Sequence, residues 1–341
     1  MNHYFDKYIF IAPGSDYGRA MWSDLEKNER CVFLEFIIGS TNHIIRLLHH
    51  IHFSFGINNR FRIPFQQIWK KSYSLNNIDF EDGNKYCIIL PDVSACRIDL
   101  EYLNWLKKKD NVKLVLVNVN VIKKKEKLLM ERWGVFAEIF SFDKSDCEKY
   151  GCIYHPTIYS LSEQDGECSQ IYDAFFIGSY TKERYKKLLS LYTAIKDHRG
   201  IADFHIIGVP QKEKRIEGIY YNTPLSYDEV VRRTKRSNCV IEIMNPGQKG
   251  LTLRAMEAIC NNKKLLTDNA TVMELPYFKT GYIKYMKEIS SDDATFSISK
   301  EKVDYRYRGD FSPNRLIERI EETFLMRQND EYFNPCCRNA K

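Results

Sequence analysis

The chain has 341 residues, of which 44% are hydrophobic and 28% are charged, as in an ordinary folded protein. This length exceeds the size at which one hydrophobic core usually stops growing, so we expect two domains. The net charge of +6 is small for a protein that binds nucleic acid over its whole surface, and we expect no nucleic-acid partner.

Neither the hydropathy nor the cysteines indicate a secreted or membrane-spanning protein. No apolar run approaches the ~20 residues that span a bilayer, and the first residues lack the long apolar core of a signal peptide. The ten cysteines form no Cys-x-x-Cys pair, which favours reduced thiols. We therefore expect a cytoplasmic protein, with peripheral binding to the inner face of the plasma membrane as an alternative.

Strands and helices alternate through the first half of the chain. The pattern predicts helices at 15–27, 100–108 and 123–133, and strands at 8–12, 31–38, 86–90, 113–118 and 136–141. Such alternation is typical of a parallel α/β sheet. Ligands of these sheets bind outside the carboxyl ends of the strands, so the loops that follow the strands form the candidate site.

Two of these loops carry polar residues that suit chemistry. After strand 8–12, Gly14 and Ser15 make a candidate phosphate loop, and Asp16 is a candidate general base. Asp92 follows strand 86–90 and is the second candidate base. The alternative is structural, because Ser15 or Asp16 can cap the next helix and Asp92 can cap the element that follows it.

The stretch from Phe36 to Ile78 contains no acidic residue. Within it an apolar helical stripe from Ile44 to Ile51 lies beside three histidines, and aromatic and basic residues then alternate up to residue 73. Such a surface suits anionic lipid headgroups or a lipid-linked acceptor. The alternative, which we favour, is a helix whose aromatic neighbours belong to the core and whose basic face is solvated. The basic residues are Arg46, Arg60, Arg62, Lys70 and Lys71.

A polar segment without periodicity, 160–172, has the character of a linker, and the α/β rhythm restarts after it. The second half predicts helices at 181–196 and 252–260, and strands at 174–177, 204–208, 219–221, 239–244 and 264–267. Ser226 is expected to cap one further helix, and Ser312 with Pro313 to open the last one. The expected organisation is a first domain at 1–159, a second at 173–311, a helix at 312–326 and a polar tail at 327–341.

The stretch from Asn238 to Asn269 concentrates the polar features of the second half. It predicts a strand, a loop broken by Pro and Gly, a helix and another strand. A glycine loop that opens a helix presents N–H groups and the positive helix end to an anion such as phosphate. The candidate binding residues are Gly178, Arg184, Lys187, Gln248, Lys249, Gly250, Leu251, Thr252, Arg254 and Glu257.

These residues also have structural explanations. Arg254 and Glu257 are three positions apart, so they can form a helix salt bridge worth only ~0.2–0.5 kcal/mol. Gly250 can simply end the loop, and Gln248 can face solvent. Glu242 lies in an apolar strand, where we expect an exposed strand end rather than a buried functional carboxylate.

Several motifs of other enzyme classes are missing. Neither half contains Gly-x-Gly-x-x-Gly after a strand or the Walker lysine loop. The sequence also lacks a Gly-x-Ser-x-Gly elbow. Redox dinucleotides, ATP hydrolysis and serine hydrolase chemistry therefore have no motif support.

The segments FFIGSY and GQKGLTLRAMEAICNNKKLLTDN resemble the donor domain of GT-B glycosyltransferases, in particular those of bacterial lipopolysaccharide, O-antigen and capsule biosynthesis. The resemblance implies an α/β fold of two Rossmann-like domains that face each other across an interdomain cleft. It also implies that the first domain binds a glycan or glycolipid acceptor and the second a UDP- or dTDP-sugar. The last helix would pack back on the first domain, and no metal or other cofactor would be required.

Carried onto this chain, the resemblance gives Glu257 the donor ribose and Gly250–Thr252 the diphosphate, whose charge Lys249 or Arg254 offsets. Many retaining members carry a second glutamate eight positions before the first, where this chain has Lys249. A lysine cannot accept hydrogen bonds from sugar hydroxyls, so retention and inversion both stay open. Two other functions also stay open: a sugar-nucleotide epimerase of similar fold, and a non-enzymatic scaffold that binds nucleotide sugars or membrane.

Overall fold

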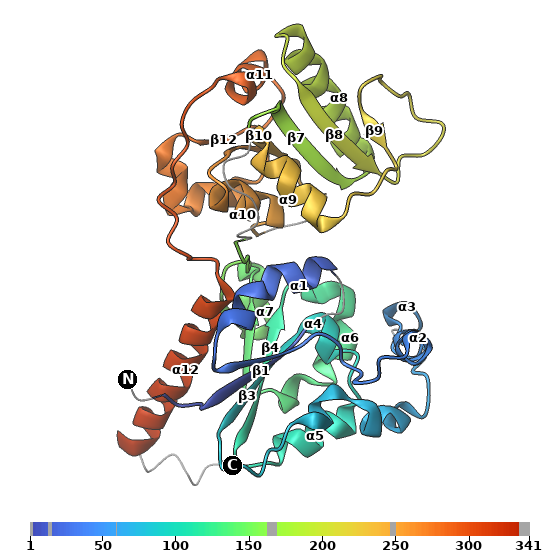
Figure 1. Ribbon diagram of the computed structural model, residues 1–341, viewed down its shortest axis with the longest axis vertical. Coiled ribbons are helices and arrows are strands. Elements are labelled where there is room, and N and C mark those ends of the chain that lie inside the picture. Colours follow the sequence, from blue (N-terminus) through green and yellow to red (C-terminus); the bar gives the residue numbers. More distant parts are fainter. Residues whose placement is uncertain (1–2, 13–15, 59, 162–168, 246–249, 334–341) are drawn as a thin grey trace. The chain divides into compact units, whose positions relative to one another are not determined.

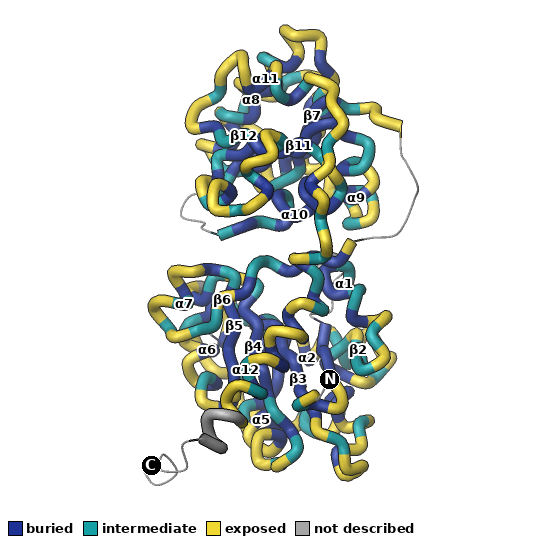
Figure 2. Tube along the Cα trace, turned by 90° about the vertical axis from the view of Figure 1, so that its left-hand side faces the viewer, coloured by how far each residue is buried: buried dark blue, intermediate teal, exposed yellow. Residues whose placement is uncertain are grey.

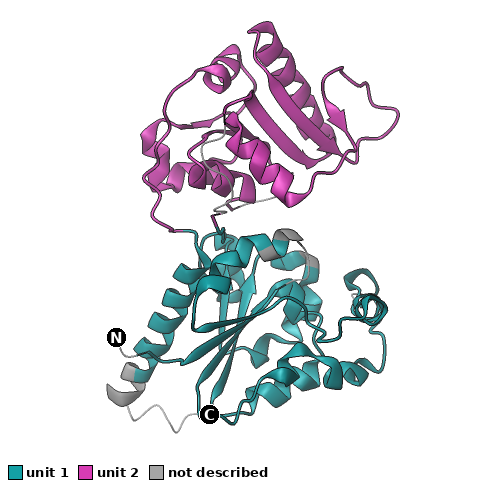
Figure 3. Ribbon diagram, in the orientation of Figure 1, with its two compact units in different colours: residues 1–160, 311–341 teal, residues 161–310 magenta. Residues whose placement is uncertain are grey.

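The computed structural model describes residues 3–12, 16–58, 60–161, 169–245 and 250–333. It divides into two compact units (Figure 3): unit 1 contains Met1–Ser160 and Phe311–Lys341, and unit 2 contains Leu161–Asp310. Each unit has a six-stranded sheet in which all neighbouring strands pair in parallel, with helices packed against it (Figure 1). The predicted α/β class with two Rossmann-like units is confirmed.

The sheet of unit 1 has the strand order β2-β1-β3-β4-β5-β6. Its strands are β1 (Lys7–Ile11), β2 (Cys31–Leu34), β3 (Tyr86–Pro91), β4 (Val112–Asn118), β5 (Glu138–Ser141) and β6 (Ile153–Tyr154). The chain runs from β1 outward to β2 and then crosses to β3 on the other side of β1. The direction of winding therefore reverses between β1 and β3, and ligands of doubly wound sheets bind at such a switch point.

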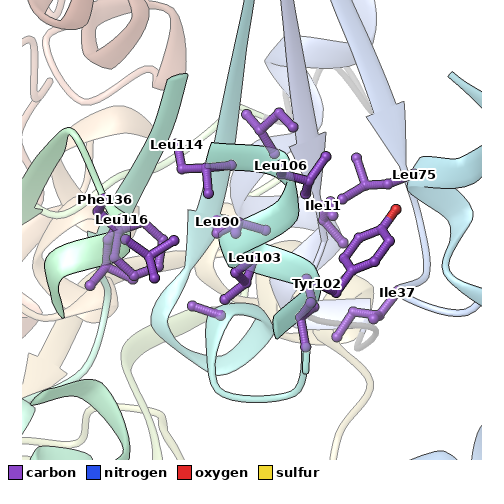
Figure 4. Close-up of a cluster of buried hydrophobic side chains, with 14 of the residues drawn as sticks. Ile11, Ile37, Leu75, Leu90, Tyr102, Leu103, Leu106, Leu114, Leu116 and Phe136 are labelled. Atoms are coloured by element: carbon purple, nitrogen blue, oxygen red, sulfur yellow. The ribbon is translucent and has the colours of Figure 1, made fainter. Parts of the chain in front are cut away.

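The central strands of unit 1 are mostly apolar, because helices cover a parallel sheet on both faces. All six residues of β3 are buried. On one face, Leu103 and Leu106 of α5 (Leu100–Lys107) belong to the same hydrophobic cluster as Leu90 and Leu114 of the sheet (Figure 4). The start of α5 is fixed by Asp99, whose carboxylate accepts the N–H of Tyr102 at 3.1 Å.

The remaining helices of unit 1 before residue 160 are short. The α-helices are α1 (Asp16–Trp22), α2 (His43–His52), α3 (Phe55–Asn58), α4 (Asp92–Ala95), α6 (Glu126–Met130) and α7 (Lys144–Tyr150). The 3-10 helices are η1 (Ser23–Lys27), η2 (Gln66–Ser72), η3 (Ser74–Asn77), η4 (Ile122–Lys125) and η5 (Trp133–Val135). The predicted helix 123–133 is thus broken into three pieces, the predicted strand 31–38 ends at Leu34, and α7 was not predicted.

The last helix, α12 (Pro313–Phe333), belongs to unit 1 and continues beyond the predicted end at residue 326. Its Glu321 accepts a hydrogen bond from the Tyr8 hydroxyl at 2.5 Å and forms an ion pair with Arg30 at 2.7 Å. Burial opposes ionisation of this carboxyl, but hydrogen bonds from Tyr8, the Tyr4 N–H and Arg30 hold the pKa of Glu321 below its usual value. The helix is therefore anchored to β1 and to the segment before β2 by one buried carboxylate.

The sheet of unit 2 has the order β12-β11-β10-β7-β8-β9. Its strands are β7 (Tyr172–Ser179), β8 (Ala202–Ile207), β9 (Tyr220–Tyr221), β10 (Ser237–Glu242), β11 (Lys264–Thr267) and β12 (Ile283–Tyr285). Counted in chain order within the unit and from the other edge, this is the 3-2-1-4-5-6 order of the dinucleotide-binding fold. Its switch point lies between β7 and β10.

The helices of unit 2 begin where the sequence places capping residues. They are α8 (Lys182–Asp197), α9 (Tyr227–Lys235), α10 (Leu253–Cys260) and α11 (Ser291–Ile298), with 3-10 helices η6 (Ala270–Glu274) and η7 (Pro276–Thr280). Every residue of α10 except Arg254 is buried, and the strands beside it are buried as well (Figure 2). This helix is therefore part of the core, not a surface element.

In the described parts of the chain, no helix has both the length and the apolar character that crossing a bilayer requires. The cysteines of these parts are free thiols, with Cys87, Cys96, Cys239 and Cys260 buried. Burial raises the pKa of Cys239 to about 12, so this thiol stays protonated and serves as a small apolar side chain.

Candidate functional site

The candidate site of unit 2 lies at the carboxyl ends of β7, β10 and β11. Gly178 is the last residue but one of β7, and α8 begins three residues after that strand ends. Thr252 caps α10 in the connection that follows β10. Because β7 and β10 are hydrogen-bonded neighbours, the fold brings the two predicted groups of residues to one edge of one sheet.

The start of α10 is held in place by side-chain bonds. The Thr252 hydroxyl accepts the N–H of Arg254 at 3.1 Å. Gly250 has φ +83°, in the left-handed region that favours glycine, and its carbonyl accepts the side-chain amide of Asn269 at 3.0 Å. Leu251 between them is buried. The positive end of α10 is therefore fixed at the switch point, as an anion site requires.

Glu242 at the end of β10 corrects an expectation, because its side chain is only 2% exposed. The hydroxyls of Thr252 and Thr267 each donate a hydrogen bond to one of its carboxylate oxygens. Burial raises the pKa of Glu242, and the two threonine bonds oppose this rise. The carboxyl group therefore joins the cap of α10 to the end of β11 and sets the geometry of the edge.

Glu257, the predicted ribose ligand, is completely buried one turn into α10. It forms an ion pair with Arg254, so the predicted helix salt bridge is present. Burial raises the pKa of Glu257 to about 7, while Arg254 and a hydrogen bond with Tyr227 oppose the rise. A carboxyl group with this pKa changes charge near neutral pH, and its ionised form can accept hydrogen bonds from hydroxyl groups.

The two predicted cations of α8 have partners within unit 2. Arg184 is buried, and its guanidinium donates to the Ser179 carbonyl at 2.8 Å. Burial lowers the pKa of Arg184, whereas Asp268 and Glu242 act to raise it. A Cβ at Gly178 would lie 3.2 Å from the Arg184 guanidinium and 2.9 Å from the Phe176 ring, so glycine is needed there for close packing and not for a phosphate contact of its own.

Asp268, directly after β11, links three elements at this edge. Its carboxylate forms an ion pair with Lys187 of α8 at 2.8 Å. It also accepts the N–H of Met244 at 2.7 Å, just beyond the end of β10. Lys187 is thus held over the strand ends by an acid that the sequence did not single out.

The candidate base of unit 1, Asp92, lies at the switch point between β1 and β3 but is fully buried. It forms an ion pair with Lys125 at 2.6 Å and accepts the side-chain amide of Asn120 at 3.2 Å. In this arrangement the carboxylate neutralises a buried lysine. To act as a base it would first have to exchange that partner for a substrate hydroxyl.

Several predicted residues lie outside the described residues: Gly14, Ser15, Gln248 and Lys249. Asp16 is the first residue of α1, and its side chain is also outside the described part. Over the described residues, no group of three or more His, Cys, Asp or Glu side chains is arranged to hold a metal ion.

Sequence reasoning missed the residues that organise the site from β11. Thr267, Asp268 and Asn269 follow one another at the end of that strand and bond to Glu242, Lys187 and the Gly250 carbonyl, respectively. The signal was a run of three polar residues directly after an apolar strand. Such a run at the carboxyl edge of a parallel sheet merits the same attention as a glycine loop.

The chain is an α/β protein built from two Rossmann-like units. No protein-family model matches the chain, and no curated protein matches it. Among solved structures, it is similar to a Listeria monocytogenes protein named as a UDP-N-acetylglucosamine 2-epimerase, with a TM-score of 0.50 and 10% identity over 95% of this chain and 97% of the other. The UDP-GlcNAc 2-epimerase of Methanocaldococcus jannaschii has a TM-score of 0.49 and 12% identity, covering 92% and 99%.

A glycosyltransferase also appears among the similar structures. T4 phage BGT in complex with its UDP-glucose substrate has a TM-score of 0.43 and 9% identity, over 86% of this chain and 88% of the phage chain. At such identities the likeness concerns the fold. What the chain binds has to be argued from its own residues.

Proposed function

We propose that the chain is a glycosyltransferase that binds a nucleotide sugar at the carboxyl edge of unit 2. The observation that carries the proposal is the capped start of α10 at the switch point, with the buried Glu257 one turn further along. A helix start offers N–H donors and positive potential to a diphosphate. A carboxylate one turn away is suited to the hydroxyl groups of the adjoining ribose.

The proposal gives each described candidate a task. Gly250, Leu251 and Thr252 lie under the donor diphosphate, and Glu257 accepts hydrogen bonds from the ribose. The departing nucleoside diphosphate needs positive charge, which Arg254, Arg184, Lys187 and Lys249 supply together with the helix end. Arg254 becomes available when Glu257 turns from the ion pair to the ribose, and Lys187 when Asp268 releases it.

On this scheme the enzyme transfers a hexose without a metal ion. Lys249 stands where many retaining glycosyltransferases have the second glutamate, so the sugar ring must be held by other groups. If the reaction inverts the anomeric centre, Asp16 or Asp92 of unit 1 is the general base that removes the acceptor proton. If it retains the configuration, no such base is required.

We further propose a lipopolysaccharide, O-antigen or capsular polysaccharide acceptor, and docking of unit 1 on the inner face of the plasma membrane. Phe61 and Phe65 are 77% and 68% exposed, whereas Phe53 is buried and Phe55 and Trp69 pack against the core, as the favoured expectation has it. Exposed aromatic rings beside basic residues suit an anionic bilayer surface. Replacing Arg60, Arg62, Lys70 and Lys71 by glutamine should weaken co-sedimentation with anionic liposomes, and an unchanged partition would contradict docking.

The donor assignment is tested by thermal shift of the full chain against a panel of nucleotide sugars, with hydrolysis of each sugar followed in parallel. We expect one nucleotide class, UDP or dTDP, to stabilise the wild type and Glu257→Ala to lose most of that stabilisation. Glu288→Ala is the matched control, because Glu288 is exposed elsewhere on unit 2. Equal stabilisation of wild type and Glu257→Ala would remove the ribose assignment.

The same panel separates transfer from epimerisation. A glycosyltransferase releases nucleoside diphosphate slowly in the absence of acceptor and leaves the configuration of the intact donor unchanged. Conversion of the donor to an epimer that is still linked to its nucleotide would replace our proposal with the epimerase function. Absence of binding to every nucleotide sugar would favour a scaffold.

A further inference from the structure

Unit 1 contains a cavity of about 410 Å³ that is lined by none of the residues proposed above for donor binding or catalysis. It lies at the carboxyl edge of the sheet, since Ala12 follows β1 and Ile37 and Ile38 follow β2. The facing wall is α2, and Arg97, just after α4, completes the lining. This volume is typical of a small-molecule site, and the edge is where doubly wound sheets bind ligands.

Two arginines give the cavity its charge. Arg46 of α2 lies 3.6 Å from the centroid of the Phe36 ring and donates from Nε to the Ser40 carbonyl at 2.7 Å. Arg97 is half-buried, and its Nε is buried without a hydrogen-bond partner. Within the described residues neither arginine has a carboxylate within ion-pair distance, and none of the lining residues is acidic. Two guanidinium groups without acidic partners form a receptor for an anion.

His49 and His50 line the same cavity but do not add to its charge at neutral pH. Burial, together with the nearby Arg97, lowers the pKa of His49 to about 4, although a hydrogen bond to the Arg97 carbonyl opposes this. Burial also lowers the pKa of His50. Because a carbonyl oxygen only accepts, the 3.0 Å contact with the Arg97 carbonyl places the His49 proton on Nε2. Arg46 and Arg97 therefore carry the positive charge, and the rings of His49 and His50 form neutral parts of the wall.

An apolar surface continues from this cavity onto the outside of α2. Leu47 both lines the cavity and is 48% exposed. Ile44, Leu48 and Ile51 on the same helix are 65%, 53% and 49% exposed. A soluble helix usually turns such residues to a core. Here the described residues leave them uncovered, so an apolar ligand can pass from the cavity onto this face.

We propose that the cavity binds an amphipathic phosphate, with the phosphate between Arg46 and Arg97 and a hydrocarbon chain along Leu47 and the exposed face of α2. A phosphate monoester carries about −1.5 to −2 charges at neutral pH, which matches two guanidinium groups better than one carboxylate does. Arginine pairs with phosphate through two parallel N–H bonds. The apolar face gives the chain a place next to the bound headgroup, so both ends of one molecule are recognised.

This assignment also deepens the proposed function, and in that respect rests on it. If unit 2 binds a nucleotide sugar, the phosphate of unit 1 belongs to a lipid-borne acceptor, and the lipid keeps the growing glycan at the membrane. The binding of the amphipathic phosphate itself does not depend on transfer. The two statements can therefore fail separately.

The test uses farnesyl phosphate below its micelle concentration as the probe, with calorimetry on the full chain. We expect it to bind, and we expect farnesol or inorganic phosphate alone to bind about tenfold or more weakly. Arg46→Gln and Arg97→Gln should each lower the affinity for farnesyl phosphate about tenfold. Arg319→Gln is the matched control, because Arg319 of α12 is exposed and does not line the cavity. Equal affinity for inorganic phosphate, or no loss in both arginine variants, would overturn the proposal.

Three further measurements keep the outcome unambiguous. Leu47→Ser changes a half-exposed side chain, so the variant should fold. Its affinity for farnesyl phosphate should fall, while its affinity for inorganic phosphate should stay unchanged. The protein should bind less to phosphatidylcholine vesicles that contain phosphatidylglycerol than to vesicles that carry the same negative charge in the form of farnesyl phosphate. Equal binding to both would show that the surface recognises negative charge alone. Binding of the nucleotide-sugar panel, measured in the same variants, reports on unit 2. Absence of binding to every nucleotide sugar in a protein that binds farnesyl phosphate would contradict only the proposed function.

Discussion

In unit 2 the charged side chains at the carboxyl edge of the sheet are paired with one another, whereas in unit 1 two arginines at the same kind of edge face a cavity. Arg254 is paired with Glu257 and Lys187 with Asp268. Arg46 and Arg97 have no such acid within the described residues. Both units have a parallel six-stranded sheet with a switch point, although their strand orders differ. The charges at the two edges differ because different polar residues follow the strands.

This difference teaches how each edge can recognise a ligand. In unit 2, the cationic and acidic side chains are held in fixed positions by bonds to one another. A ligand would replace one partner by another, and few additional side chains would have to become ordered. In unit 1 the cost of half-burying Arg97 has not been offset by an acid, and an anion would lower that cost. Unit 1 does contain one buried ion pair at its switch point, between Asp92 and Lys125. Neither of these two residues lines the cavity.

The largest loss of stability is expected from breaking the buried ion pair between Asp92 and Lys125. Asp92→Ala leaves Lys125 charged and buried without its partner, and losing one member of such a pair costs about 3–5 kcal/mol. The double variant Asp92→Ala with Lys125→Met should be less damaged than Asp92→Ala, because no charge is then left buried. Hydrogen exchange of the β3 and β4 amides measures the loss in unit 1 without requiring that both units unfold together.

If the double variant were no more stable than Asp92→Ala alone, the ion pair would not be the reason for the burial of Asp92. The described edge of unit 2 provides the control: amides of β10 and β11 should keep their protection in both variants.

The next effect concerns the acid that fixes the edge of unit 2. Glu242→Ala leaves the hydroxyls of Thr252 and Thr267 without their acceptor and opens a small void, so we expect a loss of about 2–4 kcal/mol. Glu242→Gln keeps an acceptor and should lose less. Protection of the β10 and β11 amides is again the measurement, and a loss confined to unit 1 would contradict the role assigned to Glu242.

A smaller effect follows from the neutral histidine in the wall of the unit 1 cavity. His49 has a pKa of about 4 in the folded protein against about 6.5 in an unfolded chain, so between these pH values the unfolded chain binds the extra proton. The stability that depends on neutral His49 is present above about pH 6.5 and is lost as the pH falls towards 4. Lowering the pH from about 7 to about 5 should cost about 2 kcal/mol through this group.

His49→Gln removes the titration and should flatten the pH dependence of unit 1. His50→Gln is the matched comparison. Burial lowers the pKa of His50 as well, but His50 is an exposed residue. The His50→Gln variant should therefore flatten the pH dependence of the stability of unit 1 less than His49→Gln does. Identical profiles for wild type and His49→Gln would contradict the buried neutral ring.

The fold could be predicted from the sequence because its signals are local. Apolar runs marked the strands, and β11 was predicted at its observed residues because it is short, apolar and preceded by polar residues. Ser226 caps α9 as expected, since its hydroxyl accepts the N–H of Glu229. Helices with weak periodicity, such as α7 and α11, escaped prediction, and the 123–133 helix is interrupted where its lysines give no continuous apolar face.

The site could be predicted only in part, because its decisive contacts join residues that are far apart in sequence. Glu242 meets Thr267 because β10 and β11 pair in a register that sets these two residues side by side, and register is not visible in either strand alone. The stripe on α2 was visible as a periodicity. What the sequence could not give is whether other segments cover it, and Ile44 and Leu48 are exposed.

The smallest effect that we expect is a pH dependence of donor binding in unit 2. Burial raises the pKa of Glu257 to about 7, so the carboxyl is mostly protonated at pH 6 and mostly ionised at pH 8. Ribose hydroxyls bond more strongly to the ionised form. If only that form binds, affinity for UDP-glucose should rise up to about tenfold between these pH values, in proportion to the ionised fraction.

Glu257→Gln should bind more weakly and show no such rise, because its amide does not titrate. UDP-glucose is the appropriate probe, since its diphosphate is esterified at both ends and keeps its charge over this range, unlike free UDP. A rise that persisted in Glu257→Gln would place the titrating group elsewhere. The comparison with unit 1 then becomes sharp, because Arg46 and Arg97 stay charged throughout this range whereas Glu257 in the proposed donor site does not. A pH dependence of farnesyl phosphate binding would come from the second ionisation of its own phosphate, at about pH 6.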